Sequence, residues 1–127
     1  MSFGADMDKW KSKTVNKMNN TVKFVCFNIS NSIILLTPVD TGAAKNNWQA
    51  SIGSPDRSTD STADKSGLGA IKKANDASKQ AAGNIFYLTN SLPYIKRLEE
   101  GHSKQSKLMV TRTVAAWKAY LSRGLRQ

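Results

Sequence analysis

The sequence predicts a single small α+β domain spanning residues 1–127, in which helices pack on a small, mainly antiparallel sheet. Three observations support this class: a long N-terminal stretch with helical periodicity, two short stretches with strand character, and a length of 127 residues, which suits one domain. Hydrophobic residues make up 39% of the chain. We therefore expect a modest core, together with mobile segments or surfaces that partner subunits complete.

The first element is a predicted helix over about residues 6–36. Its apolar residues recur at steps of three and four, which places them on one helical face. This face comprises Val15, Met18, Val22, Val25, Ile29, Ile33 and Leu36, and Met7 and Trp10 extend it towards the N-terminus. Because the second half is the more apolar, we expect it inside the core. The first part, about residues 1–14, is expected to project as an arm that binds a partner.

A tight turn is predicted where this helix ends. The turn is formed by Thr37, Pro38, Asp40, Thr41 and Gly42. Proline disfavours the helical conformation in the residue before it and cannot donate a backbone hydrogen bond. An aspartate side chain can bond a nearby backbone amide, and glycine can adopt a positive φ. We expect this turn to lead directly into the first strand.

Later elements follow from periodicity and from turn residues. Alternation over residues 47–52 predicts a half-buried strand containing Trp48, and the apolar run 85–89 predicts a second strand. Between them, the polar stretch 54–69 is expected to be an exposed, mobile loop, and 70–82 a short helix ended by Gly83. Residues 93–100 predict another short helix, ended by Gly101.

The last segment, 108–125, is expected to be helical or to begin as a strand. Its predicted inner face comprises Val110, Val114, Trp117 and Leu121.

The chain is strongly basic, with 19 Lys and Arg against 9 Asp and Glu and a net charge of +10. Such a surface either contacts a polyanion such as DNA or is simply solvated. Candidate DNA-facing residues are Lys96, Lys104, Lys107 and Arg112. No recognised nucleic-acid-binding motif accompanies them.

Other partners and cofactors are not expected from the composition. The single cysteine, Cys26, and the single histidine, His102, cannot supply a structural zinc site. The longest aliphatic run, Ile33–Leu36, is too short to cross a membrane, and no signal peptide is recognisable. We therefore expect no cofactor, no metal and no membrane partner.

Two catalytic hypotheses deserve comparison with simpler interpretations. Asp40-Thr41-Gly42 could form half of an aspartic protease site, in which two carboxylates share a proton. That loop belongs to an all-β fold, whereas the preceding residues have helical periodicity, so we interpret it as a turn. His102, Ser103 and a neighbouring glutamate are too close in sequence to converge as a nucleophile, base and orienting acid. We expect no enzymatic activity.

Two stretches together resemble a known family. The first is Leu36-Thr37-Pro38-Val39-Asp40-Thr41-Gly42, continuing to Trp48 and Ile52. The second is Asn90-Ser91-Leu92-Pro93-Tyr94, continuing through Leu98-Glu99-Glu100-Gly101-His102-Ser103. Their order and separation resemble those of the neck or tail-completion proteins of tailed bacteriophages, which are minor tail components at the head–tail junction.

This resemblance implies a structural virion protein that is made in the host cytoplasm. Such proteins form a ring, commonly six-fold, that completes the tail and joins it to the capsid connector. The implied partners are further copies, a tail-tube or tail-terminator protein, a head-closure or connector protein, and genomic DNA in the channel. We expect the interfaces to include Trp10, Met18, Tyr94, Arg97, Glu99, Gly101 and His102. The alternative is a basic nucleic-acid-binding module.

Overall fold

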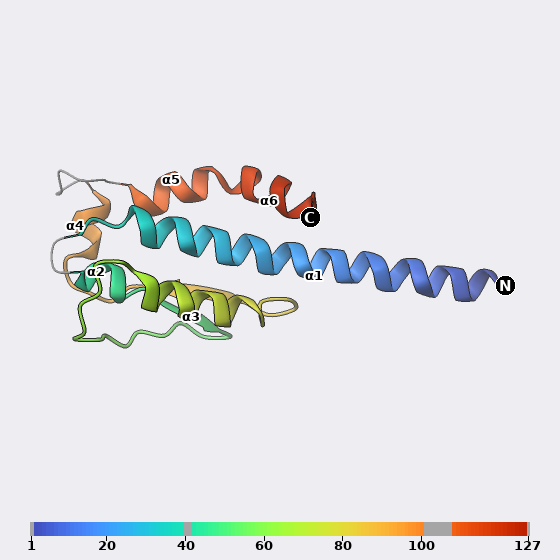
Figure 1. The fold of residues 1–127 in the computed structure, drawn as a ribbon, viewed down its shortest axis with the longest axis horizontal. Coiled ribbons are helices and arrows are strands. Elements are labelled where there is room, and N and C mark those ends of the chain that lie inside the picture. The colour runs from blue at the N-terminus through green and yellow to red at the C-terminus, as the bar shows by residue number, and fades with distance from the viewer. Residues whose placement is uncertain (1, 40–41, 101–107, 127) are drawn as a thin grey trace.

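The computed structural model describes residues 2–39, 42–100 and 108–126 and confirms the predicted α+β class (Figure 1). In chain order, the elements are α1 (Phe3–Leu36), α2 (Ala43–Asn46), β1 (Gln49–Ile52), α3 (Leu68–Ser78), β2 (Phe86–Thr89), α4 (Ile95–Glu99), α5 (Met109–Ala115) and α6 (Trp117–Leu125). The two strands pair antiparallel, with Gln49 opposite Thr89 and Ile52 opposite Phe86.

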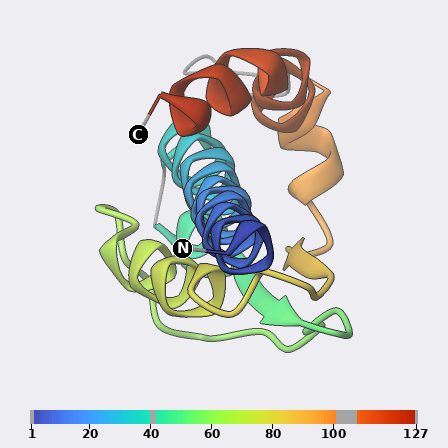
Figure 2. The ribbon, with the colours of Figure 1, turned by 90° about the vertical axis from the view of Figure 1, so that its right-hand side faces the viewer.

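Helix α1 is the axis around which the other elements pack. Helices α5 and α6 lie along one side of it, and α3 with the two-stranded sheet lies on another (Figures 1 and 2). The buried apolar core is small and sits at the C-terminal half of α1. It consists of Ile33, Ile34, Trp48, Ala70, Ala74 and Met109.

Helix α1 is longer than predicted at its N-terminus. Ser2 caps it, because its Oγ accepts a 3.1 Å hydrogen bond from the Ala5 N–H, which would otherwise lack an intrahelical partner. The 34 residues span about 51 Å at 1.5 Å per residue. The body of the protein covers only part of that length. Gly124 of α6 meets α1 at Thr21, and α1 continues beyond this point (Figure 1).

The corner after α1 is organised by Thr37. Its N–H donates to the Ile34 carbonyl (3.2 Å), and its hydroxyl donates to the Ile33 carbonyl (2.7 Å). The same hydroxyl accepts the indole N–H of buried Trp48 at 2.9 Å. The predicted end of the helix just before Pro38 is therefore confirmed. Gly42 has the expected positive φ, of +91°. Asp40 and Thr41 lie outside the described residues.

The predicted direct passage from turn to strand is wrong. The short helix α2 intervenes, and Trp48 precedes β1 instead of belonging to it. Asn47 explains the interruption. Its buried side chain donates to the Ala43 carbonyl (2.8 Å) and to the Asp60 carbonyl (3.0 Å), and accepts from the Asp60 N–H (2.7 Å). These bonds hold the backbone in a helical turn.

The polar stretch 54–69 is largely exposed, as predicted, but hydrogen bonds define its path where a mobile loop was expected. Asp56, Asp60 and Asp64 each accept from the backbone N–H two residues later, at 2.8–3.0 Å. These Asx turns recur every four residues. Asn46 adds an anchor by donating to the Thr62 carbonyl at 2.6 Å.

Helix ends also differ from the predictions. Helix α3 begins at Leu68, inside the predicted loop, and ends at Ser78, so Gly83 does not terminate it. The predicted final helix is divided at Ala116 into α5 and α6.

The buried face of this last segment differs from the predicted inner face. Val114 and Trp117 are exposed, whereas Met109 and Thr113 are buried. Thr113 Oγ1 lies 3.0 Å from Ser32 Oγ of α1, and this contact turns a different face of α5 inward.

Gly42 is the position at which we predict the largest backbone effect. A Cβ there would lie 2.5 Å from the Lys65 backbone nitrogen, and the φ of +91° is itself unfavourable for alanine. Gly83 provides the matched control, because its φ of +76° is comparable but nothing lies within 4 Å of a Cβ. In urea denaturation we expect Gly83→Ala to lose about 1 kcal/mol and Gly42→Ala about 3 kcal/mol or more. Equal losses would contradict the steric explanation.

Candidate assembly surface

The N-terminal part of α1, residues 3–18, projects from the body and is called the arm (Figure 1). Its apolar side chains are spaced so that they share one side of the helix. They are exposed to the following extents: Phe3 80%, Met7 45%, Trp10 63%, Val15 44% and Met18 60%. Both predicted interface residues of α1, Trp10 and Met18, therefore lie on this exposed stripe.

The other side of the arm is polar. Lys9, Lys13, Asn16, Lys17 and Asn20 are all exposed there. An isolated amphipathic helix of this length is only marginally stable in water, because packing of the apolar face supplies most helical stability. A contiguous apolar surface of this kind marks an interaction site. The arm thus has the composition of a helix that another surface covers.

An apolar groove continues the stripe into the body of the protein. It has a volume of about 480 Å³ and is lined by Val22, Val25, Cys26 and Ile29 of α1, facing Ala81, Ile85 and Phe86. Ile85 is 63% exposed and Val22 is 41% exposed, so the groove is open. Burial raises the pKa of the Cys26 thiol, which therefore stays protonated at neutral pH.

The second predicted interface segment lies at the other end of the molecule. Tyr94 and Arg97 are exposed on or beside α4, which sits near the C-terminal end of α1 (Figure 1). The structure therefore does not place Trp10 and Tyr94 on a common surface. Gly101 and His102 lie outside the described residues.

Glu99 has a role within the subunit that the sequence analysis missed. Its carboxylate accepts from the Val110 N–H (2.9 Å), the Thr111 N–H (2.9 Å) and the Thr111 hydroxyl (2.8 Å). Leu108, at the start of α5, has no side chain that could cap these amides, so Glu99 caps α5 from a distance. Partial burial raises the pKa of Glu99, but these hydrogen bonds outweigh it and the net shift is downward.

The two stretches that carry the family resemblance meet in space. The Asn90 side-chain amide donates to the Ala44 carbonyl at 2.9 Å, and its oxygen accepts from the Leu92 N–H at 3.2 Å. Asn90 therefore joins the end of β2 to α2, immediately after the corner. A contact between residues 46 positions apart cannot be read from local sequence patterns.

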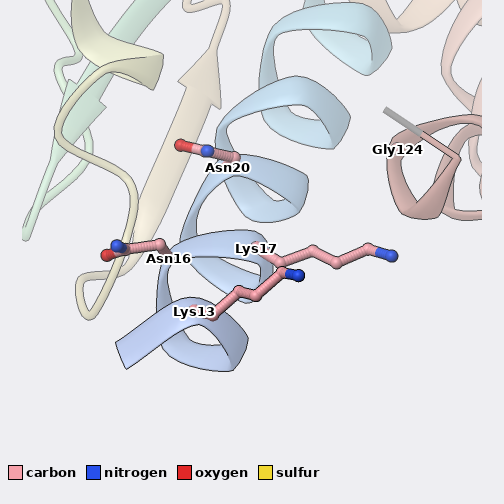
Figure 3. A pocket seen from close by; sticks show the side chains of 5 residues that line it. All are labelled: Lys13, Asn16, Lys17, Asn20 and Gly124. Carbon is pink, nitrogen blue, oxygen red and sulfur yellow. The ribbon is translucent and has the colours of Figure 1, made fainter. Parts of the chain in front are cut away.

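Of the four predicted DNA-facing residues, two lie in the described parts of the chain. Lys96 and Arg112 are exposed on α4 and α5, and Lys104 and Lys107 lie outside the described residues. Lys13 and Lys17 are not among the predicted DNA-facing residues. These lysines are one helical turn apart, and both extend towards the side where Gly124 lies, whereas Asn16 and Asn20 point the other way (Figure 3).

Residues 2–39, 42–100 and 108–126 contain no group of His, Cys, Asp and Glu side chains placed to hold a metal ion. Among the same residues, no helix combines the length and apolar character needed to cross a bilayer. Asp40, Thr41, His102 and Ser103 are not described, so the catalytic hypotheses remain untested.

We predict that the Glu99 cap makes stability depend on pH. Because the folded-state pKa of Glu99 lies below its unfolded value of about 4.3, the contribution is complete above that pH. It is lost as the pH falls through the folded-state pKa. In urea denaturation at pH 7, Glu99→Gln should lose about 1 kcal/mol, and this difference should shrink at pH 3. Glu100→Gln is the matched control, because Glu100 is exposed. Equal effects in both variants would exclude the cap.

Comparison with models of known protein families, with curated proteins and with solved structures gives no match for this chain.

Proposed function

We propose that this protein is a structural virion protein of a tailed bacteriophage that forms a ring at the head–tail junction. The ring completes the tail and joins it to the capsid connector. The observation that carries the proposal is the uncovered apolar stripe of the arm, in which Trp10 and Met18 are 63% and 60% exposed. The resemblance of residues 36–52 and 90–103 to neck proteins supplies the virion context.

The shape of the subunit suits a ring. The arm and α4 lie near opposite ends of α1, so the arm of one copy can contact the body of the next in a head-to-tail arrangement (Figure 1). Head-to-tail contacts generate closed rings when the rotation between neighbours closes. The proposed outer partners are a tail-tube or tail-terminator protein on one side and a head-closure or connector protein on the other.

A second candidate function is nucleic-acid binding, and the arrangement of Lys13 and Lys17 favours it. Two ammonium groups on adjacent turns, in a chain with a net charge of +10, can contact neighbouring phosphates (Figure 3). This function is compatible with a ring, because DNA passes through the channel of a neck. If DNA binding is a separate function, the protein is a basic DNA-binding module that does not self-assemble.

The ring proposal predicts a specific sensitivity to charge on the arm. We expect the purified protein to form rings in negatively stained electron micrographs and a single large species in sedimentation. Trp10→Glu/Met18→Glu should weaken self-association by about 100-fold or more, since it places charges where the apolar stripe must be buried. Asn16→Glu/Asn20→Glu adds the same charge to the polar side and should assemble normally.

A monomer at high concentration would contradict the ring. Equal loss of assembly in both double variants would show that net charge, and not the apolar stripe, controls association. Circular dichroism and thermal denaturation establish that each variant folds, which is expected because all four positions are exposed.

The DNA candidate predicts a salt-dependent affinity. If Lys13 and Lys17 contact phosphates, Lys13→Gln/Lys17→Gln should reduce the slope of log K against log salt by about 2. Lys65→Gln/Lys72→Gln changes the same charge at exposed positions elsewhere and should leave the slope closer to that of the wild type. Absence of DNA binding at physiological salt would remove this candidate.

A further inference from the structure

The arm and the groove have matching chemistry and length, and we propose that the arm of one copy docks in the groove of a neighbouring copy. This inference rests on the proposed self-assembly and names its donor and acceptor surfaces. The donor is the apolar side of residues 3–15. The acceptor is formed by α1 residues from Val22 to Ile33 together with Ala81, Ile85 and Phe86.

Dimensions support the pairing. From Phe3 to Val15 the arm covers about 18 Å, and from Val22 to Ile33 the floor of the groove covers about 17 Å, at 1.5 Å per residue. Both surfaces are lined by aliphatic, aromatic and sulfur-containing side chains. A helix laid along an apolar groove is a common mode of recognition.

An arm that docks in the groove must come from another copy of this chain. Arm and groove floor belong to one uninterrupted helix, Phe3–Leu36, which contains no proline and whose single glycine, Gly4, lies in the first turn. Sharp kinks need a proline, a glycine or a comparable defect. The arm therefore cannot fold back into its own groove, whereas every additional copy presents both surfaces.

The area available is that of a weak contact. At about 150–250 Å² for a fully exposed large side chain, the exposed fractions of Phe3, Met7, Trp10 and Val15 leave roughly 450 Å² to bury. Covering an equal area of the acceptor brings the total to about 900 Å², which is the size of a weak interface, so we expect docking to strengthen with protein concentration.

One polar feature of the groove also fits. Lys11 follows Met7 by four residues and thus lies on the apolar side of the arm. Asn84 lies at the groove, and its amide nitrogen donates to the Gln80 carbonyl at 2.8 Å. Its side-chain oxygen accepts no hydrogen bond from the described residues, so it can accept one from the ammonium group of Lys11.

Cys26 allows a direct test, since this single cysteine lines the groove. In Met7→Cys, oxidation of the native protein should link residue 7 of one copy to Cys26 of another. Mildly alkaline conditions are appropriate, because the pKa of Cys26 is raised. Lys9→Cys places the thiol on the polar side and is the matched control. Met7→Cys/Cys26→Ser tests the identity of the acceptor.

We expect Met7→Cys to give several-fold more cross-linked product than Lys9→Cys, and the product to disappear with Cys26→Ser. Mass spectrometry should identify the 7–26 disulfide. A ladder of linked chains supports both head-to-tail docking and the ring. Linked dimers alone support the docking but contradict the ring, because two arms then exchange reciprocally. Assembly without a 7–26 link, including assembly only with a different protein, overturns the docking and leaves the ring proposal standing.

Discussion

The apolar stripe of α1 is longer than the body that covers it, and the organisation of the protein depends on this mismatch. Where α3, α5, α6 and the sheet surround the helix, the stripe contributes Ile33 to the core. Beyond Thr21, where α6 ends against the helix, the same stripe continues with Met18, Trp10 and Phe3 exposed. A helix that is amphipathic along its whole length but buried along only part of it leaves an apolar surface available to a partner.

Hydrogen bonds supplement a small apolar core in joining the elements of the body. Thr37 joins the last turn of the helix to Trp48, and Asn47 joins α2 to the polar stretch at Asp60. Two of the six core residues, Ala70 and Ala74, are alanines, so apolar burial within one subunit is limited. Such a subunit gains from assembly, because the interface adds apolar burial that the isolated chain lacks.

Local patterns predicted the features that a short stretch of sequence determines by itself. The periodicity of α1, the positive φ at Gly42 and the strand in the apolar run 85–89 belong to this group. Features formed by distant residues were missed: the Glu99 carboxylate capping α5, the Asn90 contact with Ala44, and the contact between Thr113 and Ser32 that goes with the different inner face of α5. Helix α2 is too short to show a period. The turns in residues 54–69 did carry a signal, an Asp followed two residues later by Ser or Thr, repeated at Asp56, Asp60 and Asp64.

The central claim, that the arm is covered by protein in the assembled state, can be tested by amide hydrogen exchange measured as a function of protein concentration. At low concentration, residues 3–18 should exchange as an exposed helix, much faster than the buried half of α1. At high concentration, their protection should rise towards that of residues 29–36. An arm that exchanges at the same fast rate at every concentration would contradict the account.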